Sequence, residues 1–334
     1  MSSRNDPPAG ATAKWLAIVG IGEDGVDGLG PAARRAMEDA ELVFGGARHL
    51  ELARSILRGE ARAWPSPFDV SAVVAARGRR VCVLASGDPF LHGVGATLAR
   101  HIDPGEFRVF PAPSAFSLAA ARLGWPLHEA ETVSLHGRSA ELLMPLLHPG
   151  RRVLALTSDG AAPAAIARLA AGRGLGASRL HVLEALGGAD ERVVSFDAGD
   201  IGERRFHPLN VVAIEVAAGP EAAIVPLGCP PDDLFEHDGQ ITKHEIRAVT
   251  LAALAPRRGE LLWDIGAGAG SIAVSWMLAH PSMRAGAVEA DAERAGRIGR
   301  NAKSLGVPGL TVLHGTAPAA LAGLPSPDAV FVGG

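Results

Sequence analysis

Leu261-Leu262-Trp263-Asp264-Ile265-Gly266-Ala267-Gly268-Ala269-Gly270 is an apolar run that ends in glycines at every second position. A helical stretch begins directly after it, at Ser271. A strand, a glycine turn and a helix in immediate succession predict that backbone amides face a ligand where the strand ends. The next predicted strand ends in Val288-Glu289-Ala290-Asp291, and an acidic side chain there can accept hydrogen bonds from both hydroxyls of a ribose.

Another glycine loop lies far upstream, where Val19-Gly20-Ile21-Gly22-Glu23-Asp24-Gly25 follows a short apolar run. Its three glycines match the GxGxxG fingerprint of dinucleotide-binding proteins, which requires a helix to start inside the motif. The chain instead continues as a loop until a helix begins near Pro31, and the downstream glycine loop lacks this spacing. Both observations disfavour a dinucleotide-dependent oxidoreductase, which is kept as an alternative.

Two more loops of small residues follow predicted strands. Ser86-Gly87-Asp88-Pro89-Phe90-Leu91-His92-Gly93 follows the strand 81–85, and Pro111-Ala112-Pro113-Ser114-Ala115-Phe116-Ser117 follows the strand 107–110. Together with the upstream glycine loop they can line one crevice, because open α/β sheets bind ligands at the carboxyl ends of their strands. The alternative interpretation of Asp88 is a turn residue before Pro89.

The composition limits the classes of protein to which the chain can belong. Its 334 residues suffice for about two domains, and 48% hydrophobic with 20% charged residues is typical of folded proteins. The net charge of −4 argues against a nucleic-acid-binding protein, and the sequence contains no run of about 18 apolar residues that predicts a membrane span. Only Cys82 and Cys229 are present, which excludes a disulfide framework and a CxxC zinc site and fits the cytoplasm.

Short β-type runs alternate with helical stretches rich in Ala, Leu and Arg, which is the pattern of parallel sheets in an α/β fold. The predicted strands before residue 217 are residues 15–19, 41–44, 80–85, 107–110, 132–135, 152–156, 179–183, 193–196 and 211–216. The predicted strands after residue 238 are residues 260–265, 285–289, 310–314 and 328–332.

We therefore expect four segments in the chain. Residues 1–13 are polar, lack the apolar stretch of a signal peptide and are expected to form a disordered leader. Residues 14–218 form the first α/β domain, and turn formers mark residues 219–239 as a linker. Residues 240–334 form a second α/β domain, which we expect to be incomplete because its last strand would lie uncovered at an edge.

Residues 14–218 resemble the tetrapyrrole (class III) methyltransferases, which carry a glycine loop, an SGDP loop and a PxxS loop in this order. The resemblance implies a two-subdomain α/β fold with S-adenosylmethionine bound between the two halves. By position it assigns to the cofactor Gly20, Gly22, Gly25, Gly87, Asp88, Pro89, Gly93, Ser114, Ala115, Phe116 and Ser117. The chain departs from the family at Glu23 and Asp24, where one position is usually proline.

Residues 240–334 are similar to the class I (Rossmann-like) methyltransferases, which have a glycine motif and an acidic motif at the ends of successive strands. The resemblance assigns a second S-adenosylmethionine to Thr242, Asp264, Gly266, Ala267, Gly268, Ala269, Gly270, Glu289, Thr316 and Ala317. Thr316 stands where the family often has an acidic residue.

The segment before this domain predicts a helix start. Thr242 is the expected N-cap, and Glu245 would complete a capping box, so that the helix start covers the cofactor. His237 and His244 are seven residues apart with no cysteine nearby, and we interpret them as surface histidines. No metal site is predicted.

The pair of domains resembles the bifunctional, decarboxylating precorrin methyltransferases of cobalamin biosynthesis. This resemblance implies methylation of meso carbon 5 by the first domain, and methylation of carbon 15 with loss of an acetate carboxyl group by the second. It also implies a tetrapyrrole substrate, a homo-oligomer and one S-adenosylmethionine per domain. Arg247 is expected to bind a substrate carboxylate, because the guanidinium fork matches that group.

Two further alternatives stay open. One is a methyltransferase that acts on a different tetrapyrrole. The other is a cofactor-binding fragment that lacks the second activity.

Overall fold

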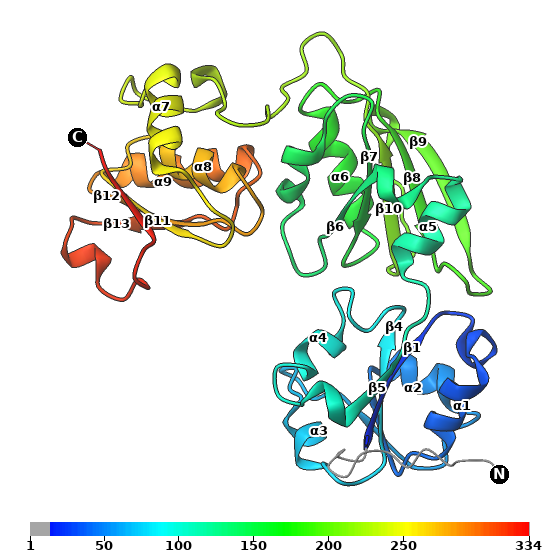
Figure 1. The fold of residues 1–334 in the computed structure, drawn as a ribbon. Coiled ribbons are helices and arrows are strands. Elements are labelled where there is room, and N and C mark those ends of the chain that lie inside the picture. The colour runs from blue at the N-terminus through cyan, green and yellow to red at the C-terminus, as the bar shows by residue number, and fades with distance from the viewer. Residues whose placement is uncertain (1–13, 334) are drawn as a thin grey trace, which may run out of the picture. The chain divides into compact units, whose positions relative to one another are not determined.

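The computed structural model describes residues 14–333, so the leader predicted at residues 1–13 lies outside the described residues. The described chain forms three β-sheets with helices between their strands, which confirms the predicted α/β class (Figure 1). It divides into two compact units. One contains the chain up to Glu129 together with residues 182–194 and 207–211, and the other contains the remainder.

The first sheet has the strand order β3-β2-β4-β1-β5, and each neighbouring pair is parallel. Its strands are β1 (Leu16–Ile21), β2 (Leu42–Gly45), β3 (Glu60–Ala63), β4 (Val81–Ser86) and β5 (Phe107–Phe110). The helices of this part of the chain are η1 (Gly25–Gly28), α1 (Pro31–Glu38), α2 (Ala47–Ala53), α3 (Ser71–Ala75), α4 (Val94–Leu98), η2 (Pro104–Glu106), α5 (Ala115–Leu123) and η3 (Leu127–Glu129).

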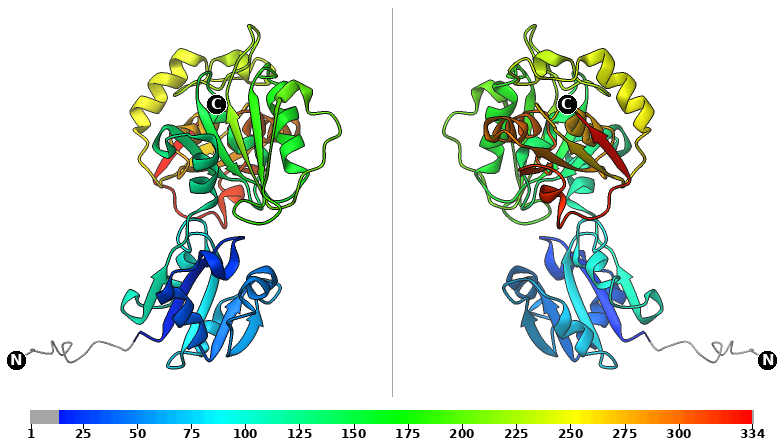
Figure 2. Two further views of the ribbon diagram at one scale, coloured as in Figure 1. Left: turned by 90° about the vertical axis from the view of Figure 1, so that its right-hand side faces the viewer. Right: turned by 90° about the vertical axis from the view of Figure 1, so that its left-hand side faces the viewer.

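The first sheet is buried on both faces. Successive side chains of a strand point to opposite faces, and those of β1 enter two different hydrophobic clusters. Leu16 and Ile18 of β1 belong to a cluster with residues of α3 and α4. Val19 and Ile21 of the same strand belong to a second cluster with residues of α1 and α2. Helices therefore cover both faces of this sheet and leave its carboxyl edge to the loops (Figure 2).

The loops that follow β1, β4 and β5 meet at that carboxyl edge. The Gly87 amide donates a hydrogen bond to the Ile21 carbonyl, and the Ala112 amide donates one to the Gly87 carbonyl, both at 3.2 Å. Gly20 lies against this junction, since a Cβ atom there would overlap the Gly87 carbonyl and lie 2.7 Å from the Ala112 nitrogen. The expectation that these three loops share one edge is confirmed.

The second sheet has the order β6-β7-β10-β8-β9. Its strands are β6 (Ala130–Ser134), β7 (Arg152–Leu156), β8 (Arg179–Glu184), β9 (Arg192–Asp197) and β10 (Asn210–Glu215). The helices of this part are η4 (Ala140–Leu146), α6 (Ala162–Ala171) and η5 (Ala198–Asp200).

The third sheet has the order β13-β12-β11-β14 and is parallel throughout. Its strands are β11 (Leu261–Ile265), β12 (Arg284–Glu289), β13 (Thr311–His314) and β14 (Ala329–Val332). The helices around it are η6 (Asp232–Leu234), α7 (His244–Leu254), α8 (Ser271–Leu278), α9 (Ala292–Ser304) and η7 (Ala319–Leu321). The final predicted strand does lie at an edge, and Val330 and Val332 there are exposed.

The sequence-based predictions missed β3, α2 and α3. β3 is a four-residue edge strand with the sequence Glu-Ala-Arg-Ala, so it lacks the alternation of apolar and polar residues that marks a strand. Helices α2 and α3 have only seven and five residues, which is too short for a clear helical period.

The predicted capping box at Thr242 is wrong. Helix α7 begins at His244, and its N-cap is Lys243, whose side chain makes no capping hydrogen bond. The first helical bond joins the Arg247 amide to the Lys243 carbonyl at 2.7 Å, so Thr242 lies one residue too early to cap the helix.

Substitution of Gly20 tests the close approach of the three loops. We expect Gly20→Ala to destabilise the chain by about 3 kcal/mol, because the new methyl group overlaps backbone atoms that have no free space. Gly299→Ala in α9 is the matched control, since a Cβ atom there meets no atom within 4 Å and alanine favours a helix. Denaturant unfolding of both variants measures the difference, and equal stabilities would contradict the tight junction.

Candidate functional site

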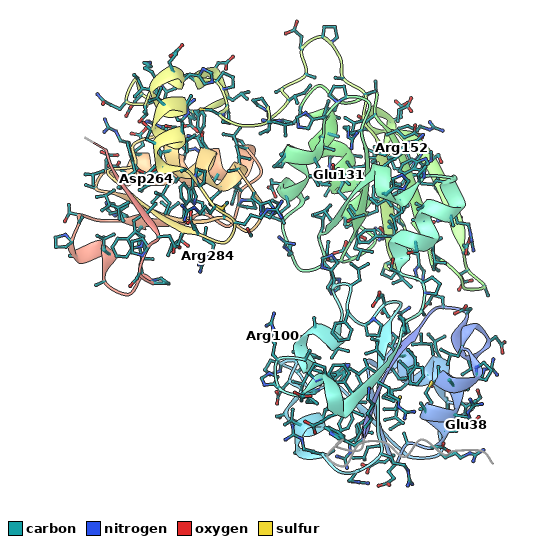
Figure 3. All side chains as sticks on the ribbon, in the orientation of Figure 1. Glu38, Arg100, Glu131, Arg152, Asp264 and Arg284 are labelled. Carbon is teal, nitrogen blue, oxygen red and sulfur yellow. The ribbon has the colours of Figure 1, made fainter. Side chains whose placement is uncertain are left out.

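The glycine loop of the third sheet contains a buried carboxylate, that of Asp264 in β11. Its side chain is 1% exposed, and Oδ2 accepts a hydrogen bond from the Ala273 amide of α8 at 3.0 Å. Oδ1 is buried and has no hydrogen-bond partner among the described residues. Burial, aided by the nearby charge of Glu289 and opposed by the Ala273 hydrogen bond, raises the pKa of Asp264 to about 7. Figure 3 shows Asp264 among the side chains of the third sheet.

Glu289 ends β12 and fixes the shape of the glycine loop. One carboxylate oxygen accepts a hydrogen bond from the Gly268 amide at 2.7 Å, and the other accepts one from the Asp291 amide at 3.0 Å. The side chain is 7% exposed. Because each carboxylate oxygen has a second acceptor position, Glu289 can hold the loop and still accept a hydrogen bond from a ligand.

The loop between β11 and α8 needs glycine for two different reasons. Gly266, Gly268 and Gly270 have φ angles of +70°, +59° and +75°, which L side chains rarely adopt. A Cβ atom on Gly270 would also lie 2.7 Å from a methyl carbon of Ile298 in α9. The amides of Gly266 and Ala267 both donate to the Val288 carbonyl, so this end of β11 is tied to β12.

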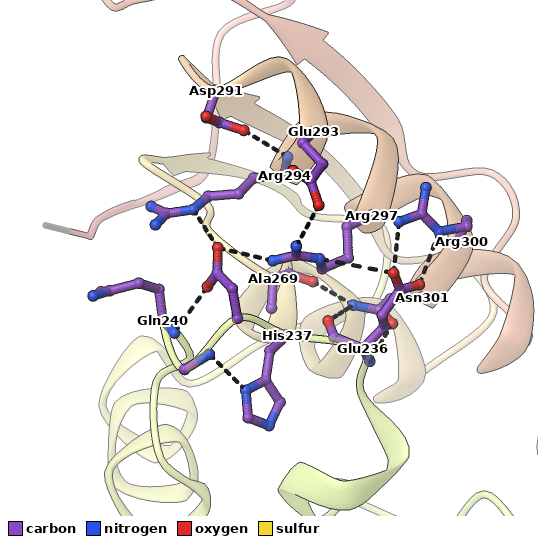
Figure 4. A network of polar contacts seen from close by, with 12 residues as sticks. Glu236, His237, Gln240, Ala269, Asp291, Glu293, Arg294, Arg297, Arg300 and Asn301 are labelled. Atoms are coloured by element: carbon purple, nitrogen blue, oxygen red, sulfur yellow. Dashed lines mark hydrogen bonds and ion pairs between the residues drawn. The ribbon is translucent and has the colours of Figure 1, made fainter.

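Residues 236–240 form a strap that lies beside this glycine loop (Figure 4). Asn301 of α9 connects the two, and it is 2% exposed. Its amide nitrogen donates to the Glu236 carbonyl and to the Ala269 carbonyl of the loop, both at 2.9 Å. Its oxygen accepts from the Glu236 amide at 2.8 Å, so one buried side chain satisfies three backbone groups.

The other end of the strap is held by charge. Asp238 accepts hydrogen bonds from the Gln240 amide and from Arg294, and it forms an ion pair with Arg297 at 3.0 Å. These three contacts hold the pKa of Asp238 well below its usual range. The Gln240 carbonyl comes within 3.4 Å of the position that a Cβ atom on Gly268 would take. The strap therefore reaches the middle of the glycine loop.

The geometry does not support the prediction that Arg247 binds substrate. The side chain is completely buried, and its guanidinium contacts the linker from every side. Its partners are the Cys229 sulfur at 3.1 Å, the Thr242 carbonyl at 2.5 Å, the Pro230 carbonyl, the Asp232 carboxylate at 3.0 Å and the Phe235 ring at 4.8 Å. Arg247 instead ties residues 229–242 to α7, and no face of it is open to a ligand.

Thr316 and Ala317 follow β13, beside the strand that ends in Glu289. The Gly315 amide donates to the Glu289 carbonyl at 2.9 Å, which places this loop next to the acidic residue. Both residues are exposed, and the Thr316 carbonyl accepts a hydrogen bond from Ala320. They lie at the same carboxyl edge as the glycine loop.

The loops of the first sheet contain several structural contacts. One Asp88 oxygen accepts from the Phe90 amide at 2.8 Å, which fits its interpretation as a turn residue and leaves its other oxygen without a hydrogen bond among the described residues. Ser114 is the N-cap of α5, and its hydroxyl accepts from the Ser117 amide at 3.1 Å. Phe116 is 1% exposed, so only its backbone can meet a ligand.

The glycines of these loops differ in what they contact. A Cβ atom on Gly93 would lie 2.5 Å from the Pro89 carbonyl oxygen, so this turn also leaves no room for a side chain, although it is less tight than the junction at Gly20. Gly22 faces the Asp24 carboxylate in the same way. Gly25 has a φ angle of +60° and packs against the Leu52 carbonyl of α2, so it serves the turn into η1.

Residues 14–333 contain neither a cluster of metal-binding side chains nor a membrane-spanning helix. No three of their His, Cys, Asp or Glu side chains gather in a way that could hold a metal ion. None of their helices is long and apolar enough to cross a membrane. The His237 ring accepts a hydrogen bond from the Gly239 amide, and the His244 ring contacts the Cys229 carbonyl.

Comparison with known proteins identifies the family. Residues 16–202 match the tetrapyrrole (corrin/porphyrin) methylases, and residues 233–334 match a precorrin methyltransferase domain. A precorrin-6Y C(5,15)-methyltransferase (decarboxylating) from a Sinorhizobium species is 61% identical over 99% of this chain and 80% of that protein. The chain belongs to the precorrin-6Y C(5,15)-methyltransferase family. The predicted fusion of two kinds of methyltransferase domain is thereby confirmed.

Two relatives of this family are shorter proteins with one named activity each. The cobalt-precorrin-7 C(5)-methyltransferase of Salmonella typhimurium is 32% identical over 53% of this chain and 88% of its own length. The "Probable cobalt-precorrin-6B C(15)-methyltransferase (decarboxylating)" of Pyrobaculum calidifontis is 43% identical over 31% of this chain and 55% of its own length.

The sequence-based analysis missed the residues that hold the strap. Asn301, Arg294 and Arg297 lie on a helix whose sequence is that of an ordinary amphipathic surface helix. Their partners in the strap and the glycine loop are more than 30 residues away. The one available signal is Asn301 itself, an amide at a position where the helical period predicts burial. Buried polar side chains are expected to have hydrogen-bond partners, which directs attention to this residue.

The raised pKa of Asp264 predicts a pH dependence of stability. Between pH 4 and 7 the folded chain keeps this proton while the unfolded chain loses it, so the contribution to stability falls as the pH rises. We expect Asp264→Asn to gain roughly 3 kcal/mol relative to the natural chain between pH 4.5 and pH 8. Denaturant unfolding without ligand at both pH values measures the free energy of unfolding of each chain. A difference between the two chains that is the same at both pH values would contradict the raised pKa.

Removal of the Asn301 amide tests the strap. We expect Asn301→Ala to cost about 3 kcal/mol, because three backbone groups lose their partner in a buried place. Arg300→Ala is the control: it breaks an exposed ion pair with Glu236 of the same strap and should cost about 1 kcal/mol or less. Unfolding gives the free energies, and hydrogen exchange should rise at residues 236–240 and 266–270 only in Asn301→Ala.

Proposed function

We propose that the chain is a bifunctional methyltransferase of cobalamin biosynthesis. It methylates a precorrin at meso carbons 5 and 15 and removes the carboxyl group of one acetate side chain. The observation that carries this proposal is the presence of two separate strand edges lined by glycine loops in a chain of the precorrin-6Y C(5,15)-methyltransferase family. Each of the two parallel sheets can bind one methyl donor at the carboxyl ends of its strands, so that each edge serves one of the two methyl transfers.

The two activities are divided between residues 14–218 and residues 240–334, with residues 219–239 as the linker. The first part methylates carbon 5, and the second methylates carbon 15 with decarboxylation. The lengths of the matches to the two single-activity relatives support this division. The C(5) relative aligns over 182 residues, similar to the tetrapyrrole methylase match, and the C(15) relative over 108, similar to the precorrin methyltransferase match.

Each domain binds one S-adenosylmethionine, which supplies a methyl group already activated as a sulfonium. In the second domain the unpartnered Oδ1 of Asp264, the remaining acceptor positions of Glu289 and the loop 266–270 hold the cofactor, with Thr316 and Ala317 beside it. A buried oxygen without a partner fits a ligand that brings hydrogen-bond donors. In the first domain the cofactor is held by three loops, those around Gly20, Gly87 to Gly93 and Ser114 to Ser117.

The protein contributes mainly position and shielding from water. Alignment of two reactants can lower a barrier by about 7–11 kcal/mol, so a glycine-lined edge needs no strong nucleophile of its own. The substrate is a tetrapyrrole with many carboxylates. With Arg247 committed to the linker, exposed side chains around the strand edges must meet these groups.

Calorimetric titration with S-adenosylmethionine tests the division. We expect two sites in the natural chain, loss of one site in Asp88→Ala and loss of the other in Glu289→Ala. Mass analysis of the product should then show that Asp88→Ala still decarboxylates the substrate, whereas Glu289→Ala does not. A single site that survives Glu289→Ala would mean that only the first activity exists, and no binding at all would contradict the proposal.

A further inference from the structure

Four polar side chains meet at the carboxyl edge of the first sheet without any role in holding the loops there. Glu23 follows β1, Arg48 and His49 lie in α2 directly after β2, and Ser86 ends β4. They come from three strand ends that the topology places at one edge. The sequence analysis named Glu23 and Ser86 as parts of two of these loops, and it assigned no role to any of the four side chains.

The four side chains form a continuous chain of contacts. Arg48 pairs with Glu23 through one guanidinium nitrogen. Its other terminal nitrogen lies 3.2 Å from the Ser86 hydroxyl and 3.2 Å from Nε2 of His49. The Ser86 hydroxyl and His49 Nε2 are 2.8 Å apart, which is the shortest of these three distances. Arg48, His49 and Ser86 thus form a closed triangle.

The triangle fixes the direction of the hydrogen bonds. A guanidinium can only donate, so Ser86 and Nε2 of His49 both accept from Arg48, and Ser86 turns its own hydrogen toward that nitrogen. His49 Nε2 then accepts, which requires the tautomer with hydrogen on Nδ1. Nδ1 is buried and has no hydrogen-bond partner within residues 14–333. The serine hydrogen is therefore aimed at a nitrogen that can take it.

His49 is neutral at physiological pH. Burial, followed by the adjacent charge of Arg48, lowers the pKa of His49 to about 4. Glu23 balances the charge of Arg48, so the four side chains together carry no net charge. Ser86 is exposed at the end of its strand, while the Glu23 side chain is 19% exposed. The Arg48 side chain is 41% exposed, so a ligand can reach the serine oxygen and the guanidinium beside it.

Methylation of a ring carbon releases a proton. A new bond joins the carbon to the methyl group, the bond between methyl and sulfur breaks with its electron pair on sulfur, and the macrocycle gains one positive charge. The macrocycle becomes neutral again when it loses one proton, so each methylation needs a proton acceptor. The cation is a strong acid, so even a weak base suffices to accept this proton.

We propose that Ser86 and His49 accept the proton that the macrocycle releases when the first domain methylates it. This inference rests on the proposed function. Ser86 is the catalytic residue, because its oxygen takes the proton from the substrate while its own hydrogen passes to His49 Nε2. His49, Arg48 and Glu23 are positioning residues: Arg48, paired with Glu23, holds the serine and the imidazole in place, and Nε2 of His49 is oriented as an acceptor toward the serine hydroxyl. The proton then leaves to water, which restores the cluster.

Single-turnover methylation of carbon 5 in the full-length chain tests the proposal. We expect a loss of about 100-fold or more in Ser86→Ala and in His49→Ala, which is the usual contribution of a general base. Free imidazole should partly restore His49→Ala, because the removed ring leaves a space next to Ser86. Methylation of carbon 15 by the second domain serves as the internal control and should keep its rate. His101→Ala, which removes an exposed histidine of the same unit, should leave both rates unchanged.

Calorimetry separates this role from a structural one. Both variants should keep two S-adenosylmethionine sites, with affinities within about threefold of the natural chain. A loss of less than about threefold in the carbon 5 rate would overturn the proposal, and so would loss of the first cofactor site or the absence of rescue by imidazole. A natural chain that does not methylate carbon 5 would instead contradict the proposed function.

Discussion

The close contact of backbone with backbone at the carboxyl edge of the first sheet is the constraint on which that unit depends. The Gly87 peptide donates to β1 and accepts from the loop after β5, so three strand ends are locked by two hydrogen bonds. Such an approach leaves no room for a side chain at Gly20. It also sets the place of Ser86, which precedes the junction by one residue, and thereby the distance from Ser86 to α2.

In the third sheet, side chains rather than backbone contacts hold the loop at the carboxyl edge. Its glycine loop is held by the bond from the Gly268 amide to Glu289 and by the bond from Asn301 to the Ala269 carbonyl, and each side-chain oxygen of these two buried residues has a hydrogen-bond partner. Asp264 is the exception, because one of its oxygens is buried without a partner among the described residues. The buried oxygen lowers the stability of the folded chain as long as no ligand donates a hydrogen bond to it. Preorganised binding sites commonly lower stability in this way.

The sequence predicts the parts of this molecule that depend on local pattern. Buried parallel strands read as apolar runs, and the loops after them read as clusters of glycine and small residues, so most strands and all four loops were found. The predictions failed where tertiary contacts decide. Arg247 reads as a free cation on a helix, but the linker folds back over it, and Thr242 reads as a cap but lies one residue outside the helix. β3 pairs with the edge of β2, whereas its own sequence does not predict a strand.

The chemistry of the strap has a consequence for the range of conditions in which it persists. Arg294, Arg297 and Arg300 keep their charge in any alkaline solution that leaves the protein folded, whereas lysine at these places would begin to lose it near pH 10. Asp238 stays ionised far into acid. The ion pairs that join the strap to α9 therefore persist in both acidic and alkaline solution. Within the second site, the raised pKa of the buried Asp264 makes the stability of the fold respond to acidity near neutral pH.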